Sequence, residues 1–119
     1  MTRAARSVFV FGIYLVATGL ILLAAPNFLL SVLRLPPTTE PWIRVLGIPM
    51  FVMGGFHIAA ARANLVQFFQ FTLWGRPFVL IAMVVLVVLR LAPPILIVFG
   101  LVDAAGAAWT LITLRKTLA

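Results

Sequence analysis

The stretch that decides the fold is ILIVFGLVDAAGAAWTLITL, residues 95–114. It contains a single charged side chain, Asp103, near its middle. At 1.5 Å per residue, a helix of this length is about 30 Å long, which matches the hydrocarbon core of a bilayer. The stretch therefore predicts a transmembrane helix that carries a carboxylate at mid-depth.

Three other apolar runs precede this one, and prolines and charged residues separate them. Pro36 and Pro37 stop the first run, ARAN (61–64) divides the second from the third, and Pro93 precedes the last. None shows the alternation of polar and apolar residues that membrane barrel strands need. The sequence predicts an all-α integral membrane protein, a single four-transmembrane-helix bundle over 1–119, with spans at about 7–30, 41–62, 65–91 and 94–115.

Composition argues against a soluble domain, and the positions of the charges argue against a nucleic-acid binder. The chain is 65% hydrophobic and 9% charged, whereas a soluble domain of this size is roughly half apolar and about a quarter charged. Its net charge of +7 is compatible with a nucleic-acid binder. However, the basic residues lie at the ends of apolar runs rather than along one stripe, so no nucleic-acid partner is expected.

The basic residues also predict the orientation in the membrane. Cytoplasmic loops are enriched in lysine and arginine, so the more basic side is expected to face the cytoplasm. This places both termini of a multi-pass membrane protein on the cytoplasmic side. The more basic side carries Arg3, Arg6, Arg62, Arg115 and Lys116, and the other carries Arg34, Arg44 and Arg90 together with Glu40.

Small residues recur at helical spacing in three of the runs. In lipid, packing drives helix association, and small residues allow two backbones to approach closely. The pattern predicts packing within the bundle, and the alternative is a face for homo-oligomers. The predicted packing residues are Gly12, Gly19, Gly47, Gly54, Gly100 and Ala104.

Arg76 is the expected partner of Asp103. Counted from the cytoplasmic ends of their runs, near Val66 and Leu114, both residues lie about 15–16 Å deep. Each charge alone would cost roughly 3 kcal/mol at mid-membrane, and together they can neutralise each other. The sequence therefore predicts an Arg76–Asp103 ion pair.

Two alternatives to this pair remain open. A helix break at Gly75–Pro77 would bring Arg76 to the interface, although only about 15 residues would then be left for the span. Arg44 could instead reach Asp103 from the outer side. The pair itself has two interpretations, a structural clasp between two helices or one wall of a polar pocket.

Other side chains at comparable depths are candidates to line that pocket, although packing and lipid contact would explain them too. His57 is most simply a hydrogen-bonded packing residue, and a proton relay is the alternative. With no cysteine and a single histidine, neither a metal site nor a cofactor is expected. The candidate pocket residues are Thr18, His57, Gln67, Gln70, Trp74 and Trp109.

Three segments resemble small bacterial four-helix membrane proteins of the DoxX-like group, in particular its members with a domain of unknown function. These segments are RVLGIPMFVMGG (44–55), WGRP (74–77) and LVDAAGAA (101–108). The resemblance covers nearly all of the chain and implies a compact bundle in a bacterial inner membrane, attached to a larger complex in some cases. Some relatives are linked to redox or quinone chemistry, for which this chain has no cysteine or pair of haem ligands.

Three functions follow as hypotheses, in order of preference. The first is a non-catalytic module that binds a lipophilic small molecule or a partner membrane subunit. The second is a small oligomeric proton-coupled transporter or channel, although small multidrug transporters rely on an acidic residue in the first helix and this chain has none there. The third is an intramembrane isomerase with Asp103 or His57 as its acid–base group.

Overall fold

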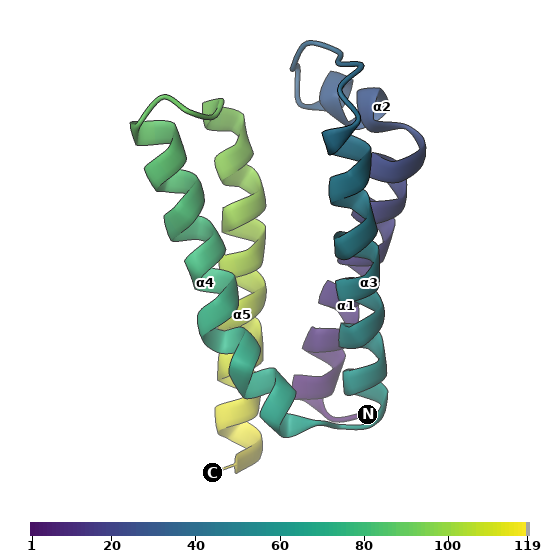
Figure 1. Cartoon of the computed structure of the whole chain (residues 1–119). Coiled ribbons are helices and arrows are strands. Elements are labelled where there is room, and N and C mark those ends of the chain that lie inside the picture. The colour runs from purple at the N-terminus through teal and green to yellow at the C-terminus, as the bar shows by residue number, and fades with distance from the viewer. Residues whose placement is uncertain (119) are drawn as a thin grey trace. The chain divides into compact units, whose positions relative to one another are not determined.

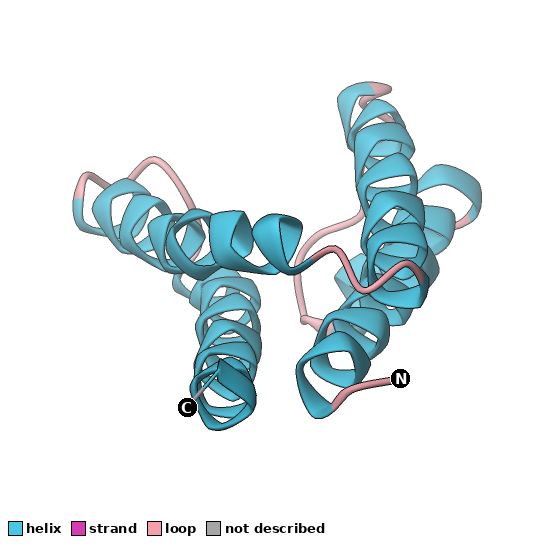
Figure 2. Ribbon diagram, turned by 90° about the horizontal axis from the view of Figure 1, so that it is seen from below, coloured by secondary structure: helices cyan, strands magenta, loops and turns pink. Residues whose placement is uncertain are grey.

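The computed structural model describes residues 1–118, which form five α-helices and one short 3₁₀ helix. In chain order these are α1 (Arg3–Ala24), α2 (Pro26–Val32), α3 (Trp42–Arg62), α4 (Val66–Val88), η1 (Pro94–Leu96) and α5 (Ile97–Leu118) (Figure 1). No strand occurs among the described residues, as the secondary-structure colouring shows (Figure 2). The predicted all-helical class is confirmed.

Four segments are long and apolar enough to cross a membrane. They are Arg3–Ala24, Trp42–Arg62, Val66–Val88 and Pro94–Lys116. The second, third and fourth predicted spans lie within a few residues of these bounds. The orientation of the termini and the assembly of all four helices into a single bundle stay predictions.

The first predicted span, 7–30, is divided in two. α1 ends at Ala24, Ala25 leaves helical geometry with φ −144° and ψ 64°, and Pro26 begins the separate helix α2. Proline supplies no N–H to the preceding turn, and its ring disfavours helical geometry in the residue before it. The same residue is well suited to the first position of a new helix.

The chain separates into two compact units. Unit 1 comprises Met1–Val8 and Ala60–Ala119, and unit 2 comprises Phe9–Ala59. In unit 1, α4 and α5 run side by side in opposite directions (Figure 1). A Cβ atom on Gly100 of α5 would lie 2.7 Å from Cα of Leu80 on α4, so the two backbones are in close contact there.

In unit 2, α1 and α3 meet through pairs of glycines. A Cβ on Gly54 would lie 2.7 Å from the carbonyl oxygen of Gly12, and one on Gly47 would lie 2.5 Å from that of Gly19. Real Cβ atoms do not approach backbone atoms this closely, so only glycine fits at these positions. Four of the predicted packing residues therefore lie where the two helices are in closest contact.

Three helices end on a residue with positive φ that is not glycine: Arg34 (58°), Asn64 (51°) and Arg90 (60°). At the end of α4, the N–H of Leu91 reaches the carbonyl of Leu86 and that of Arg90 reaches Val87, which is the Schellman pattern. This left-handed conformation favours glycine because a Cβ atom is crowded in it.

We expect Arg90→Gly to raise the free energy of unfolding by about 1 kcal/mol, because glycine removes the crowded Cβ. Unfolding in mixed micelles with increasing dodecyl sulfate measures this change. Arg90→Ala is the matched control, since it removes the same charge but keeps the Cβ. Equal stability of the two variants would show that the backbone carries no strain at Arg90.

Candidate functional site

The candidate site is built around Arg76 in the middle of α4. Phe69 and Arg76 are the two buried residues of this helix, and Arg76 is only 4% exposed. Their spacing of seven residues, two helical turns, places them on one face. α4 continues through Gly75 and Pro77 to Val88, so the alternative of a helix break at Arg76 is wrong. A guanidinium is therefore buried within an otherwise apolar membrane-type helix.

Three side chains from three helical segments of unit 1 form a hydrogen-bonded chain, which we call the polar cluster: Arg76 (α4), Thr110 (α5) and Ser7 (first turns of α1). Nη1 of Arg76 donates to Oγ1 of Thr110 over 3.4 Å, and the hydroxyls of Thr110 and Ser7 are 2.7 Å apart. Ser7 and Thr110 are both 0% exposed. The cluster ties the first turns of α1 to α4 and α5 below the protein surface.

Which group donates in each hydrogen bond of the polar cluster follows from the single hydrogen that each hydroxyl carries. Ser7 donates its hydrogen to the carbonyl of Ala4 over 2.7 Å, so it accepts the hydrogen of Thr110. Thr110 in turn accepts from Arg76. Each hydroxyl is thus donor and acceptor at once, an arrangement in which successive bonds polarise and strengthen one another.

Asp103 lies on the same helix as Thr110, seven residues earlier, and is partly buried. Because Leu80 contacts Gly100 between antiparallel helices, the backbone of Arg76, four residues before Leu80, is level with Ala104. The two charged groups attract each other electrostatically. A direct contact between guanidinium and carboxylate stays a prediction.

The hydrogen bond from Arg76 to Thr110 has a geometric reason. In a helix, each Cα–Cβ bond leans toward the N-terminus of its own helix. α4 and α5 run in opposite directions (Figure 1). The side chains of Arg76 and Asp103, whose backbones lie at nearly the same level, therefore lean in opposite directions. Arg76 leans toward the C-terminal half of α5, where Thr110 lies.

Two further candidate residues belong to unit 2. His57 is 4% exposed, its Nδ1 lies 2.8 Å from the carbonyl oxygen of Met53, and its ring centroid is 5.4 Å from that of Phe11. These contacts fit the packing role that the sequence favoured. Thr18 is 9% exposed on α1. That either residue shares a pocket with Arg76 stays a prediction.

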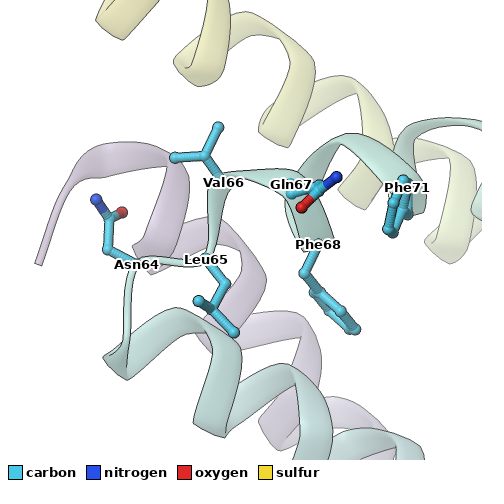
Figure 3. A pocket seen from close by; sticks show the side chains of 6 residues that line it. All are labelled: Asn64, Leu65, Val66, Gln67, Phe68 and Phe71. Atoms are coloured by element: carbon cyan, nitrogen blue, oxygen red, sulfur yellow. The ribbon is translucent and has the colours of Figure 1, made fainter.

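The other pocket candidates lie at the surface of unit 1. Trp74 is 71% exposed, Trp109 is 42% exposed, and Gln70 is exposed as well. Gln67 lines an open pocket of about 360 Å³ at the α3–α4 turn (Figure 3). Arg44, the alternative partner of Asp103, donates from Nη1 to the carbonyls of Leu23 and Ala24 over 2.8 and 3.1 Å.

Sequence reasoning missed Ser7 and Thr110. One available signal was the spacing from Asp103 to Thr110, which puts both on one face of α5. A second was depth, since the start of the first run and the end of the last run were both predicted to lie on the cytoplasmic side, which puts Ser7 and Thr110 at similar distances from it. Hydroxyl residues are inconspicuous in membrane helices because they can donate to the carbonyl of the preceding turn, as Thr113 does to Trp109 over 2.8 Å.

In comparisons with protein families, curated proteins and solved structures, none matches it. Membership of the DoxX-like group therefore stays a prediction from the three segments quoted above.

Proposed function

We propose that this chain is a non-catalytic module of the inner membrane that binds a lipophilic small molecule at the polar cluster of Arg76, Thr110 and Ser7. The observation that carries the proposal is the burial of a guanidinium, 4% exposed, in the middle of a helix apolar enough to span a bilayer. Intramembrane charges are expensive, at roughly 3 kcal/mol or more, and they commonly mark ligand or ion pathways.

The chemistry of the cluster favours one class of ligand. A guanidinium recognises a carboxylate, phosphate or other acceptor oxygen, and the apolar side chains of α4 and α5 suit a hydrocarbon or ring system. We therefore expect an amphipathic molecule with an anionic or acceptor head group. Asp103, partly buried and within electrostatic reach of Arg76, would discriminate against heads of excess negative charge.

A binding assay tests this proposal with a fluorescent fatty acid as the probe and the protein in nanodiscs. The wild-type protein is expected to bind it saturably, and Arg76→Met at least tenfold more weakly, because methionine keeps the apolar stem but removes the donors. Arg90→Gln is the matched control, since it removes one positive charge outside the helices. Equal binding by the wild-type protein and Arg76→Met would overturn the proposal.

A flux assay separates the binding module from the transporter hypothesis. Liposomes that hold a pH-sensitive dye are expected to show the same proton leak with the wild-type protein as without protein. Flux that appears with the wild-type protein and disappears in Asp103→Asn would replace the proposed function by proton-coupled transport.

A further inference from the structure

One end of unit 1 gathers five basic side chains. Two are near the start of α1, one ends α3, and two lie in the last turn of α5. This end also holds the turn between α3 and α4, and in Figure 1 the start of α1, this turn and the last turns of α5 all lie toward the lower edge of the picture. We call it the basic end, defined by Arg3, Arg6, Arg62, Arg115 and Lys116.

Two hydrogen bonds hold these segments at a common level. The hydroxyl of Ser7 contacts that of Thr110, and the hydroxyl of Thr2 donates to Oδ1 of Asn64 over 3.3 Å. From the Ser7–Thr110 contact, Arg3 lies four residues back along α1 and Arg115 five residues on along α5. At 1.5 Å per residue both are about 6–8 Å farther toward the same end.

No acidic side chain among the described residues lies at this end. The chain has two acidic residues, and neither is near it. Asp103 lies seven residues from Thr110 in the opposite direction, and Glu40 precedes the first turn of α3, whose last residue is Arg62. The basic end therefore presents uncompensated positive charge, which favours an anionic partner.

A pocket opens directly beside this charge. It has a volume of about 360 Å³ and begins two residues after Arg62 (Figure 3). Its lining combines the side-chain amides of Asn64 and Gln67 with apolar groups from the first turns of α4. The complete lining is Asn64, Leu65, Val66, Gln67, Phe68 and Phe71.

We propose that the basic end and this pocket form a binding site for an anionic phospholipid. The phosphate would lie among the basic side chains nearest the turn, and an acyl chain would lie along Phe68 and Phe71 toward the middle of α4. A soluble anion or an acidic peptide could bind the basic side chains but would leave the apolar side chains of Phe68 and Phe71 uncovered. These side chains lie along α4, which is long and apolar enough to cross a membrane, so an acyl chain fits them better. This site is separate from the polar cluster and does not depend on the function proposed there.

Native mass spectrometry of the full chain in detergent tests the proposal with phosphatidylglycerol and phosphatidylcholine as probes. We expect phosphatidylglycerol to bind at least tenfold more tightly. Each basic residue near a bilayer contributes about 1 kcal/mol of attraction to anionic lipid, so Arg62→Gln should weaken phosphatidylglycerol binding roughly fivefold. Arg62→Lys keeps the charge and should restore most of the binding, which guards against a folding defect.

Arg90→Gln is the matched control because Arg90 follows the opposite end of α4, a helix of 23 residues and therefore roughly 34 Å long. It should leave lipid binding unchanged, whereas Phe71→Ala should weaken it. Equal affinity for the two lipids, or equal losses in Arg62→Gln and Arg90→Gln, would overturn the proposal. Competition by millimolar inorganic phosphate would also overturn it, since the site would then bind the free anion.

Discussion

Alanine at Gly54 is expected to destabilise the α1–α3 pair by about 1–3 kcal/mol, the usual range for overpacking at a close contact. The added Cβ would lie 2.7 Å from the carbonyl oxygen of Gly12 and 2.7 Å from the backbone nitrogen of Val16. Both are backbone atoms, so no rotation of a side chain can relieve the contact. The two helices would have to separate, which loses the packing that drives helix association in lipid.

Gly55 provides the matched control, since it is the next residue of the same helix. A Cβ placed there meets no atom of the described chain within 4 Å. Alanine favours a helix over glycine by up to about 1 kcal/mol, so Gly55→Ala should leave stability unchanged or raise it. Unfolding by dodecyl sulfate in mixed micelles compares the two variants. If both lower stability equally, close backbone packing at Gly54 is not what stabilises the pair.

The same contact occurs a second time, which extends the prediction. Gly19 and Gly47 meet as Gly12 and Gly54 do, two helical turns away along each helix. Gly47→Ala should therefore cost a similar amount. Both contacts join the same two helices, so the separation that relieves one clash also relieves the other, and the double variant Gly47→Ala/Gly54→Ala should cost less than the sum of the two single variants.

The glycine contacts show which features a sequence alone can predict. A spacing of seven residues selects one helix face, and it distinguished Gly54 from its neighbour Gly55, which has no such contact. The apolar runs likewise predicted the helices, because a helix satisfies its backbone hydrogen bonds within one segment, and the runs lack the alternation that barrel strands need. Such features depend on spacing along a single segment.

Two kinds of feature were less predictable from the sequence: the exact residue at which a helix ends, and the direction in which a side chain points. The first span ends at Ala24 because Pro26 ends one helix and starts another, whereas hydropathy continues through both. The depth estimate placed Arg76 and Asp103 at one level, but it locates only their Cα atoms and not the ends of their side chains. The opposite lean of the two side chains, which takes Arg76 to Thr110, depends on the antiparallel packing of α4 and α5.

Thr110→Val should have the largest effect within the polar cluster. Valine has nearly the shape of threonine but removes the acceptor of Arg76 and the donor to Ser7. Loss of a buried hydrogen-bond partner costs about 1–3 kcal/mol, and more where the group left behind is charged. We expect a loss of about 3 kcal/mol in unfolding free energy, whereas Thr110→Ser, which keeps the hydroxyl, should lose 1 kcal/mol or less.

A double-mutant cycle with Arg76→Met isolates the bond to the guanidinium. The cycle is run in an Asp103→Asn background, so that Arg76→Met leaves no partly buried carboxylate without its countercharge. Replacing both members of a buried charge pair is often neutral for stability, so Arg76→Met should change it little there. Once Arg76→Met is present, Thr110→Val breaks only the bond to Ser7, and its cost should fall to about 1 kcal/mol. The difference of about 2 kcal/mol is the expected coupling between Arg76 and Thr110.

The cycle also distinguishes a clasp from a binding site. If Arg76 serves to hold α4 against α5, Arg76→Met must lower the free energy of unfolding as much as Thr110→Val does. If Arg76 serves to bind an amphipathic ligand, the Arg76→Met variant should keep the fold and bind the fluorescent fatty acid much more weakly. A stable Arg76→Met variant that binds the probe as tightly as the wild-type protein would contradict both roles, because the buried charge would then serve neither stability nor binding.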